Sequence, residues 1–182
     1  AGDNDRLIQT FVFTESECCN CGVVGAALHS SQLFVHTDYN FDWEPLGKLL
    51  TVTAANRNHI YTIDNLTAVD AFAKYLGEDF AQGLPHTGQE YPLMAEREGT
   101  VISRPVIGRL ENGGVVVNAN MRVGEKVRFG YANFNTVLQS AQKMHQQLEQ
   151  QPMESVFVYY CTARLGFFKA VGVRETLPNY CD

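Results

Sequence analysis

The sequence lacks any cluster of lysine or arginine residues and any long apolar run. Fourteen basic side chains stand against twenty acidic ones, which gives a net charge of -6. Nucleic acids are poor partners for such a chain, because binding them depends on clustered cations that neutralise phosphates. The longest apolar runs, such as Val23–Leu28, fall far short of the roughly 20 residues that a membrane-spanning helix needs. We therefore expect no nucleic-acid partner and no membrane span.

Motifs for common enzyme chemistry are missing as well. The chain contains no G-x-x-x-x-G-K-[ST] or G-x-G-x-x-G phosphate loop, no H-E-x-x-H zinc motif and no G-x-S-x-G nucleophile motif. It starts at Ala1 with neither a methionine nor a signal-peptide pattern, so we expect a piece of a longer protein. We also predict that this chain is not itself an enzyme.

Cysteine is present in an odd number, which argues against a secreted disulfide framework. Three of the five cysteines lie within Cys18–Cys21, where close neighbours are poorly placed to pair with each other. A reducing, cytoplasmic setting fits this pattern better. Structural zinc usually requires two separated cysteine pairs, and the chain has no second pair. We expect a cytoplasmic location and no metal site.

Apolar periodicity predicts two amphipathic helices. The first covers Ala68–Leu76, where apolar residues recur four apart on one face. The second covers Val137–Leu148, where they recur at the first, fifth, eighth and twelfth positions. Polar residues that can cap a helix precede each of them. The predicted caps are Asp64 or Asn65 for the first helix and Asn135 or Thr136 for the second.

Short runs rich in β-branched and aromatic residues predict strands. Asn56–Asn58 and Glu111–Gly114 each favour a tight antiparallel hairpin, because asparagine and glycine tolerate left-handed backbone angles. Several glycines and prolines mark Glu78–Pro92 as a linker near a domain boundary. The expected strands are Ile8–Phe13, Val23–Leu28, Leu33–Thr37, Leu49–Ala55, His59–Ile63, Thr100–Leu110, Val115–Ala119, Lys126–Tyr131 and Val156–Cys161.

These elements predict an α/β to α+β fold. The sheets are mixed and largely antiparallel, with helices packed against them. The linker divides the chain into two structurally related halves, residues 1–80 and residues 81–182.

The segment Val156–Arg164 contains the first candidate for a binding site. Its apolar and aromatic run predicts a strand buried on both faces, and α/β folds tend to bind ligands beyond the ends of such strands. Arg164 follows the run, and its guanidinium offers a planar donor fork to a carboxylate. An arginine paired with a local acid is the alternative. Cys161 falls on the opposite strand face, so we expect it to pack at the site rather than act as a nucleophile.

Arg104 and Trp43 complete the candidate site. Arg104 precedes Pro105, which favours an extended backbone inside the apolar run Val101–Ile107. An arginine in that setting either lines a pocket or neutralises a buried acid. Trp43 either walls the pocket or covers an edge of the core. The candidate ligand-binding residues are therefore Arg164, Arg104, Trp43 and Cys161, with the two arginines gripping an anionic group.

Several segments spread along the chain together resemble one family. In the first half they are Ala1–Asn4, Val23–Leu28, Trp43–Gly47, Thr53 and Ile60–Gly77, and in the second half Tyr91–Leu93, Ser103–Val106, Arg122–Glu125 and Val156–Arg164. These segments resemble the FIST family. Residues 1–80 resemble the later part of its amino-terminal region, and residues 81–182 resemble most of its carboxyl-terminal region.

The resemblance implies a bacterial intracellular sensory module that binds a small molecule, such as an amino acid or a small carboxylate. It also implies an attached output domain: a GGDEF diguanylate cyclase, a histidine kinase or a chemotaxis-type methyl-accepting domain. The family usually begins with further strand and helix units and usually ends in a glycine- and aromatic-rich segment. Neither is present here, so we expect a fragment whose pocket is shared with the missing parts.

Three alternatives stay open. The resemblance also covers haem-dependent nitric oxide sensors, in which a histidine such as His145 or His36 would hold the iron, although we expect no cofactor. A thiol enzyme centred on Cys161 would need a base close to the sulfur. A structural interaction domain would use exposed sheet edges to dock a partner or to form a homodimer.

Overall fold

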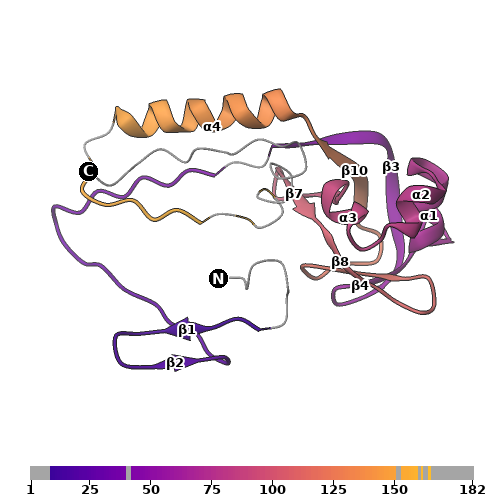
Figure 1. The fold of residues 1–182 in the computed structure, drawn as a ribbon, viewed down its shortest axis with the longest axis horizontal. Coiled ribbons are helices and arrows are strands. Elements are labelled where there is room, and N and C mark those ends of the chain that lie inside the picture. The colour runs from indigo at the N-terminus through magenta and orange to yellow at the C-terminus, as the bar shows by residue number, and fades with distance from the viewer. Residues whose placement is uncertain (1–8, 40–41, 151–152, 160, 162–163, 165–182) are drawn as a thin grey trace. The chain divides into compact units, whose positions relative to one another are not determined.

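The computed structural model describes residues 9–39, 42–150, 153–159, 161 and 164 (Figure 1). The chain divides into two compact units, one of them Asn40–Gln151 and the other Ala1–Tyr39 together with Pro152–Asp182. Within the described part of the chain, none of the helices has the length and apolar character that crossing a membrane requires.

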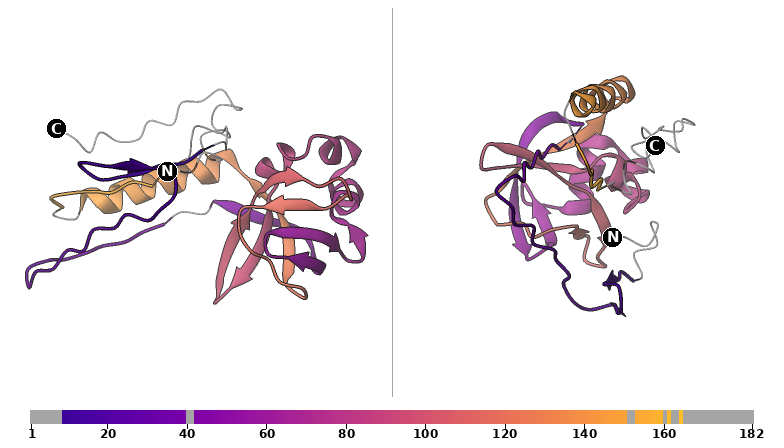
Figure 2. Two further views of the ribbon diagram at one scale, coloured as in Figure 1. Left: turned by 90° about the horizontal axis from the view of Figure 1, so that it is seen from below. Right: turned by 90° about the vertical axis from the view of Figure 1, so that its left-hand side faces the viewer.

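The larger unit is built on an eight-stranded antiparallel sheet, whose strands follow the order β7-β6-β10-β3-β4-β9-β8, with β5 beside β4. Only Pro105 separates β7 from β8 in the sequence, although these strands lie at opposite ends of that order. The sheet therefore curls strongly (Figure 2). The strands are β3 (Trp43–Asn56), β4 (His59–Ile63), β5 (Leu66–Thr67), β6 (Leu93–Arg97), β7 (Thr100–Arg104), β8 (Val106–Arg109), β9 (Val115–Val117) and β10 (Lys126–Ala132).

Three helices of this unit pack against the sheet: α1 (Ala68–Leu76), α2 (Glu78–Gln82) and α3 (Thr87–Glu90). Phe72 of α1 is fully buried, and its ring meets that of Phe129 edge to face, with the centroids 4.9 Å apart. At Gly88 of α3, a Cβ atom would lie 2.6 Å from the Cβ of Val106. Glycine therefore allows α3 to approach β8 closely.

A fourth helix, α4 (Phe134–Glu149), follows β10. The Asn133 side chain caps it by accepting hydrogen bonds from the backbone N–H groups of Asn135 and Thr136. Val137 is its one fully buried residue, and half of its residues are half-buried.

The smaller unit contains a short hairpin of β1 (Val12–Phe13) and β2 (Cys18–Cys19). Its turn is held by Thr14, whose hydroxyl oxygen accepts hydrogen bonds from the N–H groups of Ser16 and Glu17.

The predicted mixed α/β class with largely antiparallel sheets is confirmed. The two strands expected around Asn56–Asn58 pair as β3 and β4. The helix expected over Ala68–Leu76 and the strand expected over Lys126–Tyr131 are both present. The assignment of residues 1–80 and 81–182 to two related halves stays a prediction.

Both predicted helix caps are wrong. Asp64 and Asn65 have positive φ angles of 49° and 64° and form the turn between β4 and β5, so Thr67 caps α1 instead. The cap of α4 is Asn133, whose side-chain oxygen reaches the first free N–H groups of the helix. In both cases the pairing or turn that precedes the helix decides where it begins.

The linker predicted over Glu78–Pro92 is also wrong, because α2 and α3 form there. Ala81 and Leu84 bury their side chains in the core, which fixes this segment against the sheet. The single strand expected over Thr100–Leu110 is divided into β7 and β8 at Pro105, which cannot donate a hydrogen bond to a sheet.

The remaining strand predictions are not met in the smaller unit. Residues 23–28 and 33–37 form no strand. Of the predicted strand at Ile8–Phe13, Ile8 lies outside the described residues, and among the others only Val12 and Phe13 pair. The described residues of the predicted buried strand Val156–Cys161 are not in a strand either, and Tyr159 is 95% exposed. A β-rich run becomes a strand only when a neighbouring strand accepts its hydrogen bonds, and no described strand does so here.

Candidate functional site

Arg104 lies at the end of β7 and faces the core side of the sheet. In the antiparallel register Arg104 is opposite Leu93, and Ile102 is opposite Ala95. Leu93 and Ala95 are fully buried. Because residues directly opposite each other point to the same face of a sheet, the Arg104 side chain shares the apolar face with these residues.

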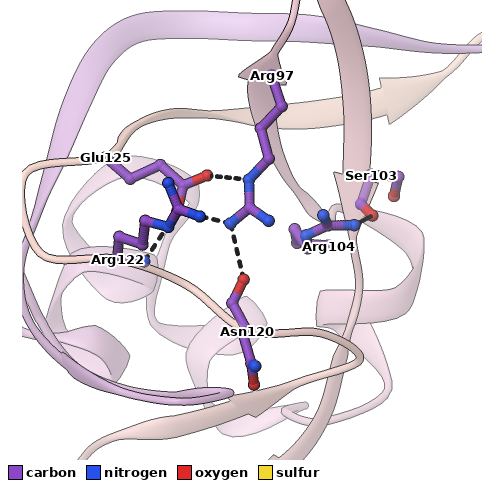
Figure 3. Close-up of polar contacts among 6 residues, drawn as sticks. All are labelled: Arg97, Ser103, Arg104, Asn120, Arg122 and Glu125. Atoms are coloured by element: carbon purple, nitrogen blue, oxygen red, sulfur yellow. Dashed lines mark hydrogen bonds and ion pairs between the residues drawn. The ribbon is translucent and has the colours of Figure 1, made fainter.

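An ion pair lies next to this arginine (Figure 3). The Arg97 Nε donates to the Glu125 Oε1 at 2.7 Å, and the Arg97 Nη2 donates to the Glu125 Oε2 at 2.9 Å. The same Nη2 donates to the Asn120 carbonyl oxygen at 2.7 Å, and the Glu125 Oε2 accepts the Arg122 backbone N–H at 2.9 Å. The charge of Arg97 is therefore compensated by a bidentate carboxylate.

Arg104 has no such compensation. Its Nη1 donates to the Ser103 carbonyl oxygen at 3.2 Å, whereas its buried Nε has no hydrogen-bond partner in the structure. Burial, together with the positive charge of Arg97, lowers the pKa of Arg104, and Glu125 acts in the opposite direction. Arginine stays protonated at neutral pH even so. A buried N–H group without an acceptor costs about 1–3 kcal/mol, which an incoming anion could offset.

The cluster of Arg97, Arg104 and Glu125 thus holds two cations and one anion. Its excess positive charge is on Arg104, whose buried Nε has no acceptor. A planar guanidinium in this state is suited to a carboxylate or a similar small anion.

Trp43 begins β3 and lies half-buried. Its indole Nε1 donates to the Glu90 carbonyl oxygen at 3.3 Å, which connects the start of β3 with the end of α3. This contact fits a tryptophan that covers an edge of the core. A contact between Trp43 and a ligand stays a prediction.

Cys161 and Arg164 belong to the smaller unit. Cys161 is a free, exposed thiol, and Arg164 is half-buried. The expectation that Cys161 packs inside the protein is therefore not met, because the preceding run forms no buried strand. Binding of one ligand by both Arg164 and Arg104 stays a prediction.

Two family models match the chain. The model described as FIST N domain matches residues 1–66, and the model described as FIST C domain matches residues 68–179. The chain belongs to the FIST family. FIST domains are sensory modules of signal-transduction proteins. No curated protein and no solved structure matches the chain.

Sequence reasoning did not single out Arg97 and Glu125 of this FIST chain. Arg97 is carried by a hairpin in which Glu98 and Gly99 join β6 to β7 in a two-residue turn, both with positive φ angles. Gly99 is the local sequence signal for this turn, because glycine favours such angles. The ion pair joins Arg97 to Glu125, which lies 28 residues later in the sequence, and it depends on how the strands pair.

The histidines considered for haem lie in two different settings. His36 is exposed, and the His145 Nε2 lies 3.1 Å from a carboxylate oxygen of Glu149. Within the described ranges, no group of three histidine, cysteine or acidic residues could hold a metal ion.

We expect Cys18, Cys19, Cys21 and Cys161 of this FIST chain to react at similar, rapid rates with a thiol reagent in the native state, because all four are exposed. Mass spectrometry after brief alkylation at neutral pH, with Cys181 replaced by serine, would measure each rate. Selective labelling of Cys161, many times faster than the other three, would contradict this expectation. It would favour the thiol enzyme instead.

Proposed function

We propose that this FIST chain is the small-ligand-sensing input module of a bacterial, cytoplasmic signal-transduction protein. Its ligand carries a carboxylate or a similar anion, as an amino acid or a small carboxylate does. The observation that carries the proposal is the buried, unpartnered Nε of Arg104 beside an Arg97 that Glu125 already neutralises. A ligand that accepts a hydrogen bond from this group stabilises the arrangement that binds it.

The signal then passes to an output domain attached in the same protein. A GGDEF diguanylate cyclase, a histidine kinase or a chemotaxis-type domain fills this role in the proposal. Ligand binding shifts the population of two arrangements of the module, and the output domain responds to the favoured one. Arg164 is the second proposed anion contact, and Trp43 and the exposed Cys161 are the other proposed ligand contacts.

Replacing Arg104 by methionine tests the ligand contact, and the expected result has two parts. The variant should be as stable as the wild type or up to about 2 kcal/mol more stable, because it removes a buried donor without an acceptor and keeps an apolar stem. It should also lose the rise in melting temperature that an anionic ligand causes. Thermal unfolding with a panel of amino acids and small carboxylates, glutamate and succinate among them, would measure both.

Arg109→Met is the matched control, because Arg109 is an exposed arginine on β8, the next strand in the sequence. It should leave both the stability and the ligand response unchanged. A panel in which no compound stabilises the wild type would contradict the proposed function. A response that survives in Arg104→Met would move the ligand contact away from Arg104.

A further inference from the structure

A small cavity lies where β3 bulges away from β10. Leu50 pairs with Val127 and Leu46 pairs with Phe129, so four steps along β3 correspond to only two steps along β10. Gly47 lies within this bulge with a φ angle of 75°, a conformation that favours glycine. The bulge leaves a cavity of about 90 Å³.

The walls and the mouth of the cavity differ in character. Leu46, Leu50, Leu76 and Phe129 supply apolar surface, whereas Lys48 and Tyr75 supply polar groups. This combination of apolar walls with a few convergent polar groups is typical of a small-molecule site.

The mouth carries an excess of positive charge. The Nζ atoms of Lys48 and Lys74 lie 5.0 and 5.6 Å from the centroid of the Tyr75 ring. The charge of Lys48 is partly compensated, since its Nζ is 3.2 Å from the Asp64 Oδ2. The other oxygen of Asp64 accepts the Thr51 backbone N–H at 2.8 Å. The two ammonium groups beside the Tyr75 ring favour an anion at this position.

The cavity is lined by two segments that lie outside the cluster of Arg97, Arg104 and Glu125. Leu46 and Gly47 come from the segment Trp43–Gly47, and Tyr75 and Leu76 come from α1, about 30 residues later in the chain. None of these residues belongs to the cluster around Arg104. The bulge, the helix end and the two lysines thus form a separate site.

We propose that this cavity binds a short-chain monocarboxylate such as propionate. The carboxylate accepts hydrogen bonds from the Lys48 ammonium and the Tyr75 hydroxyl, and the alkyl chain packs against Leu50 and Phe129. The size sets the length of the ligand: an apolar cavity of about 150 Å³ holds benzene, so this one takes a chain of roughly three or four heavy atoms. An amino acid should bind more weakly than propionate, because its ammonium group adds positive charge close to Lys48 and Lys74.

Titration of the full chain, labelled with nitrogen-15, with sodium propionate tests this site by nuclear magnetic resonance. We expect saturable shifts of the amide signals of Gly47, Lys48 and Leu76. Lys48→Gln should weaken binding by about tenfold or more, because it removes a charge-assisted hydrogen bond from an exposed residue without disturbing the core. Tyr75→Phe should weaken it by a smaller factor. Lys143→Gln, an exposed lysine on α4, should bind as the wild type does.

Ligands of other charge or length sharpen the test. Propylammonium should leave the three amide signals unshifted, and alanine should bind more weakly than propionate. Hexanoate should also bind more weakly than propionate because its chain exceeds the cavity. Unsaturable shifts, or a Lys48→Gln variant with wild-type affinity, would overturn the proposal.

The site at Arg104 is tested separately by the same titration. Arg104→Met should keep the propionate shifts at Gly47, and their loss in that variant would assign the carboxylate to Arg104 and overturn this second site. Conversely, a Lys48→Gln variant that loses propionate but keeps the response to the ligand panel leaves the proposed sensing role intact.

Discussion

Replacing Phe72 by alanine should lower the free energy of unfolding by about 3–5 kcal/mol. The side chain is fully buried, and its ring packs edge to face on Phe129 at 4.9 Å between centroids. Alanine loses both the transfer of the ring out of water and the aromatic contact, and it leaves a void between α1 and the sheet. Urea unfolding monitored by circular dichroism would measure the change.

Phe13→Ala is the matched control, because the Phe13 side chain is 69% exposed. It should change the free energy of unfolding by less than about 0.5 kcal/mol. Equal effects of the two substitutions would contradict the placement of α1 over the core.

Replacing Glu125 by alanine should lower the free energy of unfolding by about 2 kcal/mol. Only 10% of the Glu125 side chain and 34% of the Arg97 side chain are exposed, so the substitution leaves Arg97 partly buried beside Arg104 without the carboxylate that compensates its charge. Breaking one partner of a fully buried pair costs about 3–5 kcal/mol, and solvent at Arg97 reduces that figure. A double-mutant cycle with Arg97→Met would isolate the interaction, and additive effects would contradict it. Glu149→Ala, at a 62% exposed side chain, is the control.

The same carboxylate should make stability depend on pH. Burial by itself would raise the pKa of Glu125, but hydrogen bonds from Arg97 and from the Arg122 N–H outweigh it and hold the pKa below its ordinary value of 4.5. A group whose pKa is lower in the folded state stabilises the fold above its unfolded pKa, and this contribution is lost as the pH falls through the folded pKa. Between neutral pH and acid, the wild type should therefore lose more stability than Glu125→Gln.

Local sequence was sufficient where neighbouring residues decide the conformation. The helix Ala68–Leu76 is present as its apolar spacing predicts, and the hairpin at Asn56–Asn58 forms where its asparagines favour a turn. Arg104 was identified as a candidate because an arginine inside an apolar run must find a partner. The structure places Arg104 on the apolar face of β7 with an unpartnered Nε, and its contact with a ligand stays a prediction.

Local sequence failed where a distant partner decides the outcome. The run Val156–Cys161 has the composition of a buried strand, yet its described residues find no strand to pair with and stay exposed. The reverse holds for Glu78–Pro92, where glycines and prolines indicate a linker but burial of Ala81 and Leu84 holds two short helices on the core. Composition shows what a segment can form, and the surface available to cover it decides what it does form.

The sequence by itself determined the FIST family, the mixed antiparallel class and the candidacy of Arg104. Only the tertiary structure decided which arginine is neutralised, because the register of β6, β7 and β10 brings Glu125 to Arg97 and leaves the buried Nε of Arg104 without an acceptor. It also decided that a bulge in β3 opens a cavity beside Tyr75. Both features depend on strands that pair across many residues, a relation that no local pattern in the chain encodes.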